Sequence, residues 1–129
     1  MLIIVVMISL IALIGLPKFT RTNARRYMDA ARTRVSASLV TARQAAIQKG
    51  GRVEFRVVKS RVVVVSGTDT LIRMPLDTLF NVDAQPESLS IYFNGRGFTS
   101  NAASQTITLT RPGTATDSVF VSKWGMVQR

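Results

Sequence analysis

The fold of this chain is decided by its first residues, "MLIIVVMISLIALIGLPKFTRTNARR" (residues 1–26). The first sixteen carry no charge, and only Ser9 and Gly15 interrupt a run dominated by Ile, Val and Leu. As a helix the run would be hydrophobic on every side and would reach about 24 Å, short of the roughly 30 Å hydrocarbon core of a bilayer. It is compatible with a membrane-embedded helix, a buried core helix or a signal peptide.

A signal peptide requires basic residues before the apolar run and a small-x-small cleavage site after it. Neither is present, because the run starts at Met1 and is followed by "GLPKFTRT" (15–22). We therefore favour a membrane-embedded helix. Its apolar residues are Leu2, Ile3, Ile4, Val5, Val6, Ile8, Leu10, Ile11, Leu13, Ile14 and Leu16.

The same helix is expected to continue far beyond the apolar run. From residue 19 to residue 49 there is no Gly or Pro, and apolar or small residues recur at the three-and-four spacing of an amphipathic helix. These are Tyr27/Met28, Ala31, Val35, Leu39, Ala42 and Ala46. "KGG" (49–51) supplies a stop signal, and Pro17 predicts a bend. The predicted divisions are a membrane-embedded half-helix at 1–17, an amphipathic half-helix at 18–50 and a β-domain at 51–129.

The remainder of the chain changes to β periodicity. β-Branched and aromatic runs of strand length fall at 52–58, 61–66, 70–74, 88–93, 105–110 and 118–123, separated by turn residues. "RVEFRVV" (52–58) alternates apolar and charged residues, as a sheet with one wet face does. The segment 75–87 is expected to connect strands, with Leu76, Leu79, Phe80 and Val82 over a sheet edge. The predicted class is α+β, with the long helix packed on a small antiparallel sheet domain.

Composition argues against an enzyme or a metal protein. The chain has no Cys and no His, so it offers no disulfide, no thiolate and none of the usual zinc or copper ligands. Its acidic residues are scattered, and the Lys59/Ser60 and Ser122/Lys123 pairs are strand neighbours that should point to opposite faces. We expect no catalytic site, no cofactor and no metal. "NGRG" (94–97) is expected to be a tight turn.

The net charge of +10 raises the question of nucleic acid binding. Residues 1–50 carry eight cationic side chains against Asp29 alone, whereas residues 51–129 carry nine against six acids. Most of the excess therefore lies along the helix, where a solvated face or lipid headgroups would account for it. A cation–aromatic–cation set at the C-terminus, made of Lys123, Trp124 and Arg129, is a candidate for stacking a base, but for Trp124 we prefer a role capping the core.

The sequence resembles the type IV pilin superfamily, including the pseudopilins of type II secretion. The resemblance rests on the N-terminal run ending in Leu16, Pro17 and Phe19. It extends to "LVTARQAAIQKGGRVEFRV" (39–57), "IYFNGRGFTS" (91–100), "ITL" (107–109) and "VFVSKWGMVQ" (119–128), which are similar to the GspH/FimT branch. In that superfamily the apolar helix is preceded by a basic leader, a Gly and a Glu just inside the mature N-terminus. Aligned on Leu16 and Pro17, that Glu falls immediately before Met1, so we expect Met1 to be an internal methionine and the gene to read upstream into such a leader.

The resemblance implies a structural subunit of a filament. Such a minor pilin or pseudopilin sits in the bacterial inner membrane by a single span, with its C-terminal domain in the periplasm. It passes into a pseudopilus or pilus together with other pilins, where the apolar residues above form the filament core and Pro17 shapes the helix. Two alternatives stay open: a minor pilin that binds DNA weakly for uptake, and a membrane-anchored binding module that never polymerises.

Overall fold

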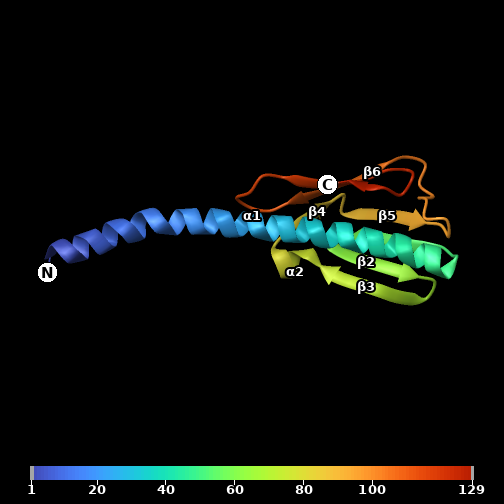
Figure 1. Cartoon of the computed structure of the whole chain (residues 1–129), viewed down its shortest axis with the longest axis horizontal. Coiled ribbons are helices and arrows are strands. Elements are labelled where there is room, and N and C mark those ends of the chain that lie inside the picture. The colour runs from blue at the N-terminus through green and yellow to red at the C-terminus, as the bar shows by residue number, and fades with distance from the viewer. Residues whose placement is uncertain (1, 129) are drawn as a thin grey trace.

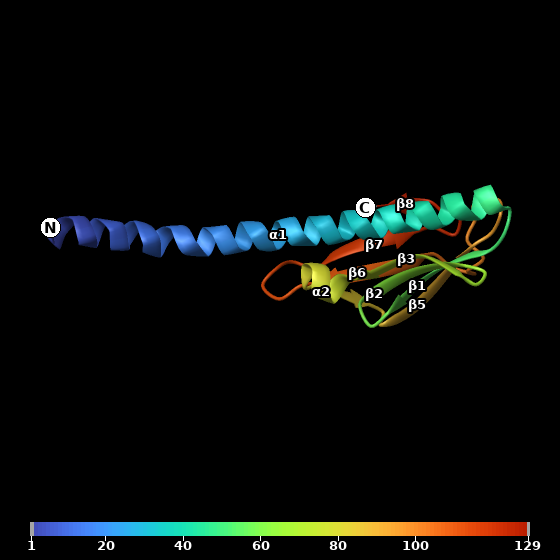
Figure 2. The same ribbon diagram turned by 90° about the horizontal axis from the view of Figure 1, so that it is seen from below.

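One continuous helix organises the molecule. The structure is a computed structural model that describes the backbone of residues 2–128 and the side chains of residues 3–10 and 22–128. Helix α1 spans Leu2–Lys49 and passes through Pro17 without a break. Figure 1 and Figure 2 show α1 gently curved, with its first half projecting alone and its second half lying on the β-domain. This arrangement confirms the predicted α+β class.

The second half of α1 buries the stripe expected from the sequence. Its members lie between 0% and 4% exposed: Met28, Ala31, Val35, Leu39, Ala42 and Ala46. Tyr27, the alternative to Met28, is 48% exposed. Gly50 adopts φ +60°, and the Gly51 N–H donates to the Ala46 carbonyl at 3.2 Å, which ends the helix in the way glycine permits.

The β-domain consists of two four-stranded antiparallel sheets. The first has the order β3-β2-β1-β5 and the second the order β4-β6-β7-β8. The strand bounds are Val53–Val58 (β1), Arg61–Ser66 (β2), Asp69–Pro75 (β3), Asp83–Gln85 (β4), Ser88–Phe93 (β5), Gln105–Thr110 (β6), Asp117–Val121 (β7) and Val127–Gln128 (β8). The six longer strands match the predicted runs. Strands β4 and β8 have three and two residues, too short for a period-two pattern to be read in the sequence.

The core lies between α1 and the inner faces of both sheets. In β1, Val53, Phe55 and Val57 are fully buried while Arg56 is exposed, so the predicted alternation is confirmed. The second sheet contributes Ile107 and Leu109 from β6 to the same cluster. Every antiparallel pair of β1 with β2 and with β5 keeps an unbroken register, which holds this buried face on one side of the sheet.

The connector between the sheets is more ordered than the sequence suggests. Residues Leu76–Phe80 form the short helix α2, which ends at Asn81 with φ 52°. Leu76 and Val82 are fully buried, as expected. The expectation for Leu79 is wrong, because its side chain is 53% exposed on the outer side of that single helical turn, and Phe80 is only partly buried.

Candidate functional site

The described start of the projecting half of α1 exposes a row of large apolar side chains. We call residues 3–10 the apolar arm. Its large side chains are between 50% and 76% exposed: Ile3, Ile4, Val5, Val6, Met7, Ile8 and Leu10. Of the predicted core-helix residues, the side chains of Leu2, Ile11, Leu13, Ile14 and Leu16, together with Pro17, lie outside the part of the chain whose side chains are described.

The one polar side chain within the apolar arm is satisfied by its own helix. The Ser9 hydroxyl donates to the Val5 carbonyl at 2.8 Å, so it needs no water. Each large aliphatic side chain of the arm gains about 1.5–3 kcal/mol when it leaves water, so a continuous exposed row of them marks an interaction surface. Within the described residues, no helix meets the length and apolarity required for a membrane crossing.

At the opposite end of the molecule two turns of identical design lie together, and we call them the paired turns (residues 94–98 and 122–126). In the first, the Gly97 N–H donates to the Asn94 carbonyl and the Asn94 N–H to the Phe98 carbonyl, both at 2.9 Å. In the second, Gly125 donates to Ser122 and Ser122 to Met126, again both at 2.9 Å. Each is a type I turn followed by a glycine bulge, with φ +79° at Gly97 and Gly125.

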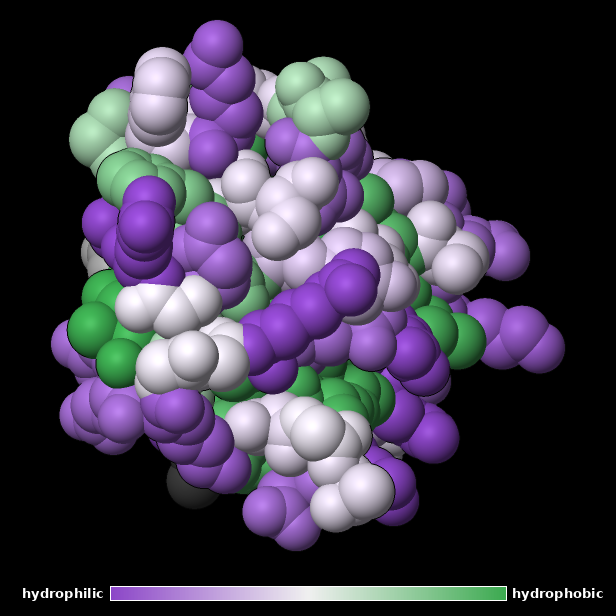
Figure 3. Space-filling view, turned by 90° about the vertical axis from the view of Figure 1, so that its right-hand side faces the viewer, coloured by the Kyte–Doolittle hydropathy of each residue, from purple (hydrophilic) through white to green (hydrophobic). Residues whose placement is uncertain are grey.

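The paired turns pack against each other and against the end of α1. A Cβ atom on Gly97 would come within 2.8 Å of the Ile47 Cδ1 atom, so glycine allows the close approach of this turn to the helix. The Thr99 hydroxyl donates to the Lys123 carbonyl at 2.7 Å and joins the two turns. The surface of this end is mixed, with separate hydrophobic patches among hydrophilic side chains (Figure 3).

Two of the three predicted nucleic acid contacts meet on the paired turns. The Lys123 ammonium lies 5.1 Å from the centre of the Trp124 ring, and the Phe98 ring meets Trp124 edge to face at 6.1 Å. Arg129 lies outside the described residues. The expectation that Trp124 caps the core is wrong: the side chain is 57% exposed, because Trp124 occupies the tip of a hairpin turn that projects from the sheet.

Sequence reasoning missed Phe98, which is 41% exposed beside Trp124. The signal that would have found it is the shared spacing of "NGRGF" (94–98) and "SKWGM" (122–126), in which a glycine follows the turn start by three residues. That spacing predicts the same bulged turn twice but does not predict that the two turns are neighbours. "NGRG" is a tight turn, as expected.

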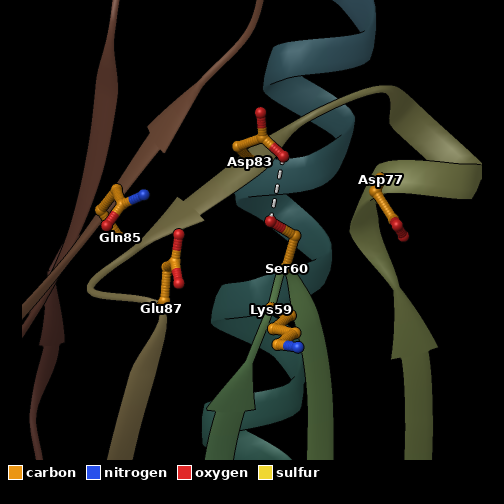
Figure 4. A pocket seen from close by; sticks show the side chains of 6 residues that line it. All are labelled: Lys59, Ser60, Asp77, Asp83, Gln85 and Glu87. Carbon is orange, nitrogen blue, oxygen red and sulfur yellow. Dashed lines mark hydrogen bonds between the residues drawn. The ribbon is translucent and has the colours of Figure 1, made fainter.

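A polar pocket of about 390 Å³ lies at the end of the β1–β2 hairpin. It is lined by Lys59, Ser60, Asp77, Asp83, Gln85 and Glu87 (Figure 4). The Ser60 hydroxyl donates to Asp83 at 3.1 Å and accepts the Ala84 N–H at 3.2 Å, so it fastens the hairpin to β4 and is not paired with Lys59. Within the described residues, no three His, Cys, Asp or Glu side chains are grouped to hold a metal ion.

Comparison with solved structures places the chain in the type IV pilin-like fold. Two crystal structures of the Pseudomonas aeruginosa type IV minor pilin FimU superpose on it with TM-scores of 0.67 and 0.64, each at 14% sequence identity. The first superposition covers 81% of this chain and 88% of the FimU chain in that crystal structure. The second covers 78% of this chain and 90% of the FimU chain. No protein-family model and no curated protein matches the chain.

Proposed function

We propose that this protein is a minor pilin or pseudopilin, a structural subunit without catalytic activity that is held in the bacterial inner membrane by the first half of α1. Its β-domain lies in the periplasm. The subunit then passes into a type IV pilus or a type II secretion pseudopilus, where the apolar arm packs among the helices of other pilins.

The observation that carries this proposal is the division of α1 into two unlike halves. Its second half is covered by the β-domain, whereas the apolar arm is uncovered and projects away from every other element (Figure 2). In lipid a helix satisfies its own backbone groups, and transfer into a bundle replaces lipid contacts with packing against similar helices. The likeness to a minor pilin in fold supports the same role.

Membrane attachment is tested by placing one charge in the apolar arm. The full chain and its Ile8→Lys variant are expressed in bacteria, and membranes are washed with alkaline carbonate. Ile8→Lys should release most of the protein into the wash, because a lysine within the hydrocarbon costs about 2.5–3.5 kcal/mol. Val40→Lys is the matched control, since Val40 is 43% exposed on the same helix but lies over the β-domain. Equal retention of Ile8→Lys and the unaltered chain contradicts membrane insertion of the arm.

Assembly is tested by disulfide cross-linking, which the absence of native cysteine makes clean. A chain with Ile4→Cys and Leu10→Cys is expressed in a host that makes pili or a pseudopilus, and intact cells are oxidised. Filament packing predicts a ladder of cross-linked species containing pilins. The ladder forms because each helix contacts neighbouring helices at the level of residue 4 and again at the level of residue 10. A chain that stays monomeric favours the membrane-anchored module that does not polymerise. Deletion of the gene distinguishes the two machines. Loss of surface pili indicates a type IV pilus, and loss of a secreted protein indicates a type II secretion pseudopilus.

Weak DNA binding is a second candidate, favoured by the exposed Trp124 and Phe98 rings beside Lys123. Aromatic faces stack bases, and adjacent cations meet phosphates. The fluorescence of Trp124, the single tryptophan, is followed during titration with duplex and single-stranded DNA at low salt. Specific binding predicts a large loss in a Lys123→Ala, Arg129→Ala variant and none in Arg34→Ala; equal losses indicate generic electrostatics. Affinity should largely vanish by about 200 mM salt.

A further inference from the structure

A groove of about 510 Å³ runs between the last turns of α1 and strand β8. Its apolar walls are Val40 and Ile47 from α1 and Met126 from the paired turns, which are 43%, 48% and 50% exposed. Arg43 is the only charged residue among the described residues that line it. The groove lies at the end of the molecule opposite the apolar arm, so what it binds is a question separate from membrane attachment and assembly.

Strand β8 forms one side of this groove and is an edge of its sheet. Among the described strands it pairs with β7 alone, with Phe120 opposite Gln128 and Val121 opposite Val127. Because Ser122 donates to the Met126 carbonyl, the alternation of an antiparallel ladder makes Val121 and Val127 a pair that exchanges no hydrogen bonds. The N–H and C=O of Val127 therefore point away from β7, toward the free edge. An edge of this kind is a template for one more strand.

Two charged side chains described beside this edge, those of Arg43 and Lys123, are both positive. The Arg43 Nε atom is buried and has no hydrogen-bond partner among the described residues. Lys123, exposed on the adjoining turn, adds a second positive charge, and none of the described residues that line the groove is acidic. Because protein atoms enclose the Nε atom, a carboxylate in the groove would meet the terminal guanidinium nitrogens of Arg43, and a charge-assisted hydrogen bond there would offset the cost of desolvating this arginine.

We propose that this groove binds an extended, acidic segment of another protein by strand addition to β8. The segment forms backbone hydrogen bonds with Val127, places alternate apolar side chains on Val40, Ile47 and Met126, and directs a carboxylate to Arg43. Strand addition supplies affinity through the backbone, and the apolar walls and Arg43 supply selectivity.

The probe is a short synthetic peptide of alternating valine and threonine with one central aspartate. It is titrated into the full-length protein in detergent micelles while Trp124 fluorescence is recorded. We expect saturable binding that weakens about tenfold or more when aspartate is replaced by asparagine, because a charge-assisted bond is lost. The same peptide with alternate backbone nitrogens methylated should not bind, since it offers no donors to the edge.

Two protein variants locate the site. Val127→Pro removes the outward N–H, and proline is tolerated at edge positions whose N–H faces solvent, so binding should be lost while thermal unfolding stays cooperative. Arg43→Gln should abolish the preference for aspartate over asparagine, and the control Arg34→Gln, an exposed position of the same helix, should keep it. Equal binding of the methylated and unmethylated peptides overturns the proposal. The proposal is also overturned if oligothymidine displaces the peptide and its binding depends on Arg43 in the same way. That result would assign the groove to nucleic acid.

Discussion

Gly125 and Gly97 lie in contact across the paired turns: a Cβ atom on Gly125 would overlap the carbonyl oxygen of Gly97. Both residues are buried and both have φ +79°. The contact is between two pieces of backbone, which cannot move aside as a flexible side chain can. The exposed Trp124 and Phe98 rings, and the end of the groove beside β8, therefore take their positions from two glycines.

Gly125→Ala should lower the free energy of unfolding substantially. The left-handed conformation costs an alanine about 1–2 kcal/mol, and overpacking against the Gly97 backbone adds about 1–3 kcal/mol. Gly113→Ala is the matched control, because Gly113 has φ +77° but an added Cβ atom would have nothing within 4 Å, so only the conformational cost applies. Urea denaturation measures both. Equal losses in the two variants would mean that the backbone contact is not rigid.

Removal of residues 1–23 should leave a soluble domain that unfolds cooperatively, because the buried stripe of α1 begins at Met28. A fragment that starts at residue 36 is the control. It lacks Met28, Ala31 and Val35, all of which are buried, and should not fold. Circular dichroism during thermal unfolding distinguishes the two fragments. Aggregation of the longer fragment under mild conditions would show that the first segment belongs to the globular core.

The ion pair between Arg32 and Asp117 joins α1 to β7, with an N–O distance of 3.1 Å and side chains 27% and 26% exposed. Asp117→Asn should cost about 1–2 kcal/mol of stability, because it leaves a half-buried guanidinium without its anion. In Asp69→Asn no measurable change is expected, since Lys49 and Asp69 are 4.0 Å apart and far more exposed. A double-mutant cycle with Arg32→Ala isolates the coupling, and a coupling of zero contradicts a stabilising pair.

Acid should weaken the fold partly through Glu54. Burial acts to raise the pKa of this carboxyl, but hydrogen bonds from Arg56, Ser90 and Tyr92 and the charge of Arg56 outweigh it, so the pKa lies below the ordinary 4.5. A depressed pKa contributes stability above pH 4.5, and this is lost as the pH falls through the folded-state pKa.

The Glu54→Gln variant tests this contribution. It should be less stable than the unaltered chain at neutral pH, by less than about 1 kcal/mol, and the difference should shrink toward acid pH. Unfolding by urea at a series of pH values measures it, with the exposed Glu87→Gln as control. A stability difference that grows as the pH falls would contradict a lowered pKa of Glu54 in the folded state.

The periodicity and composition of the sequence by themselves determine the long helix and the longer strands of this protein. The uninterrupted apolar run, the three-and-four spacing from Met28 to Ala46 and the alternation in β1 are local patterns. The face that is buried in the last two follows from the geometry of the helix or strand itself. The closing "KGG" ends α1 through a local glycine conformation in the same way. These features suffice for the α+β class.

Only the tertiary structure decides what lies next to what. Strands β4 and β8 are too short to carry a period and exist because longer neighbours offer them hydrogen bonds. The sequence favours a buried Trp124, yet the side chain is exposed because a bulged turn carries it beyond the ends of β7 and β8. The contact of Gly97 with Gly125, the pairing of Phe98 with Trp124 and the groove beside Arg43 each join segments far apart in the chain. The spacing of residues along the sequence does not predict these contacts, because they depend on how the two sheets pack on one helix.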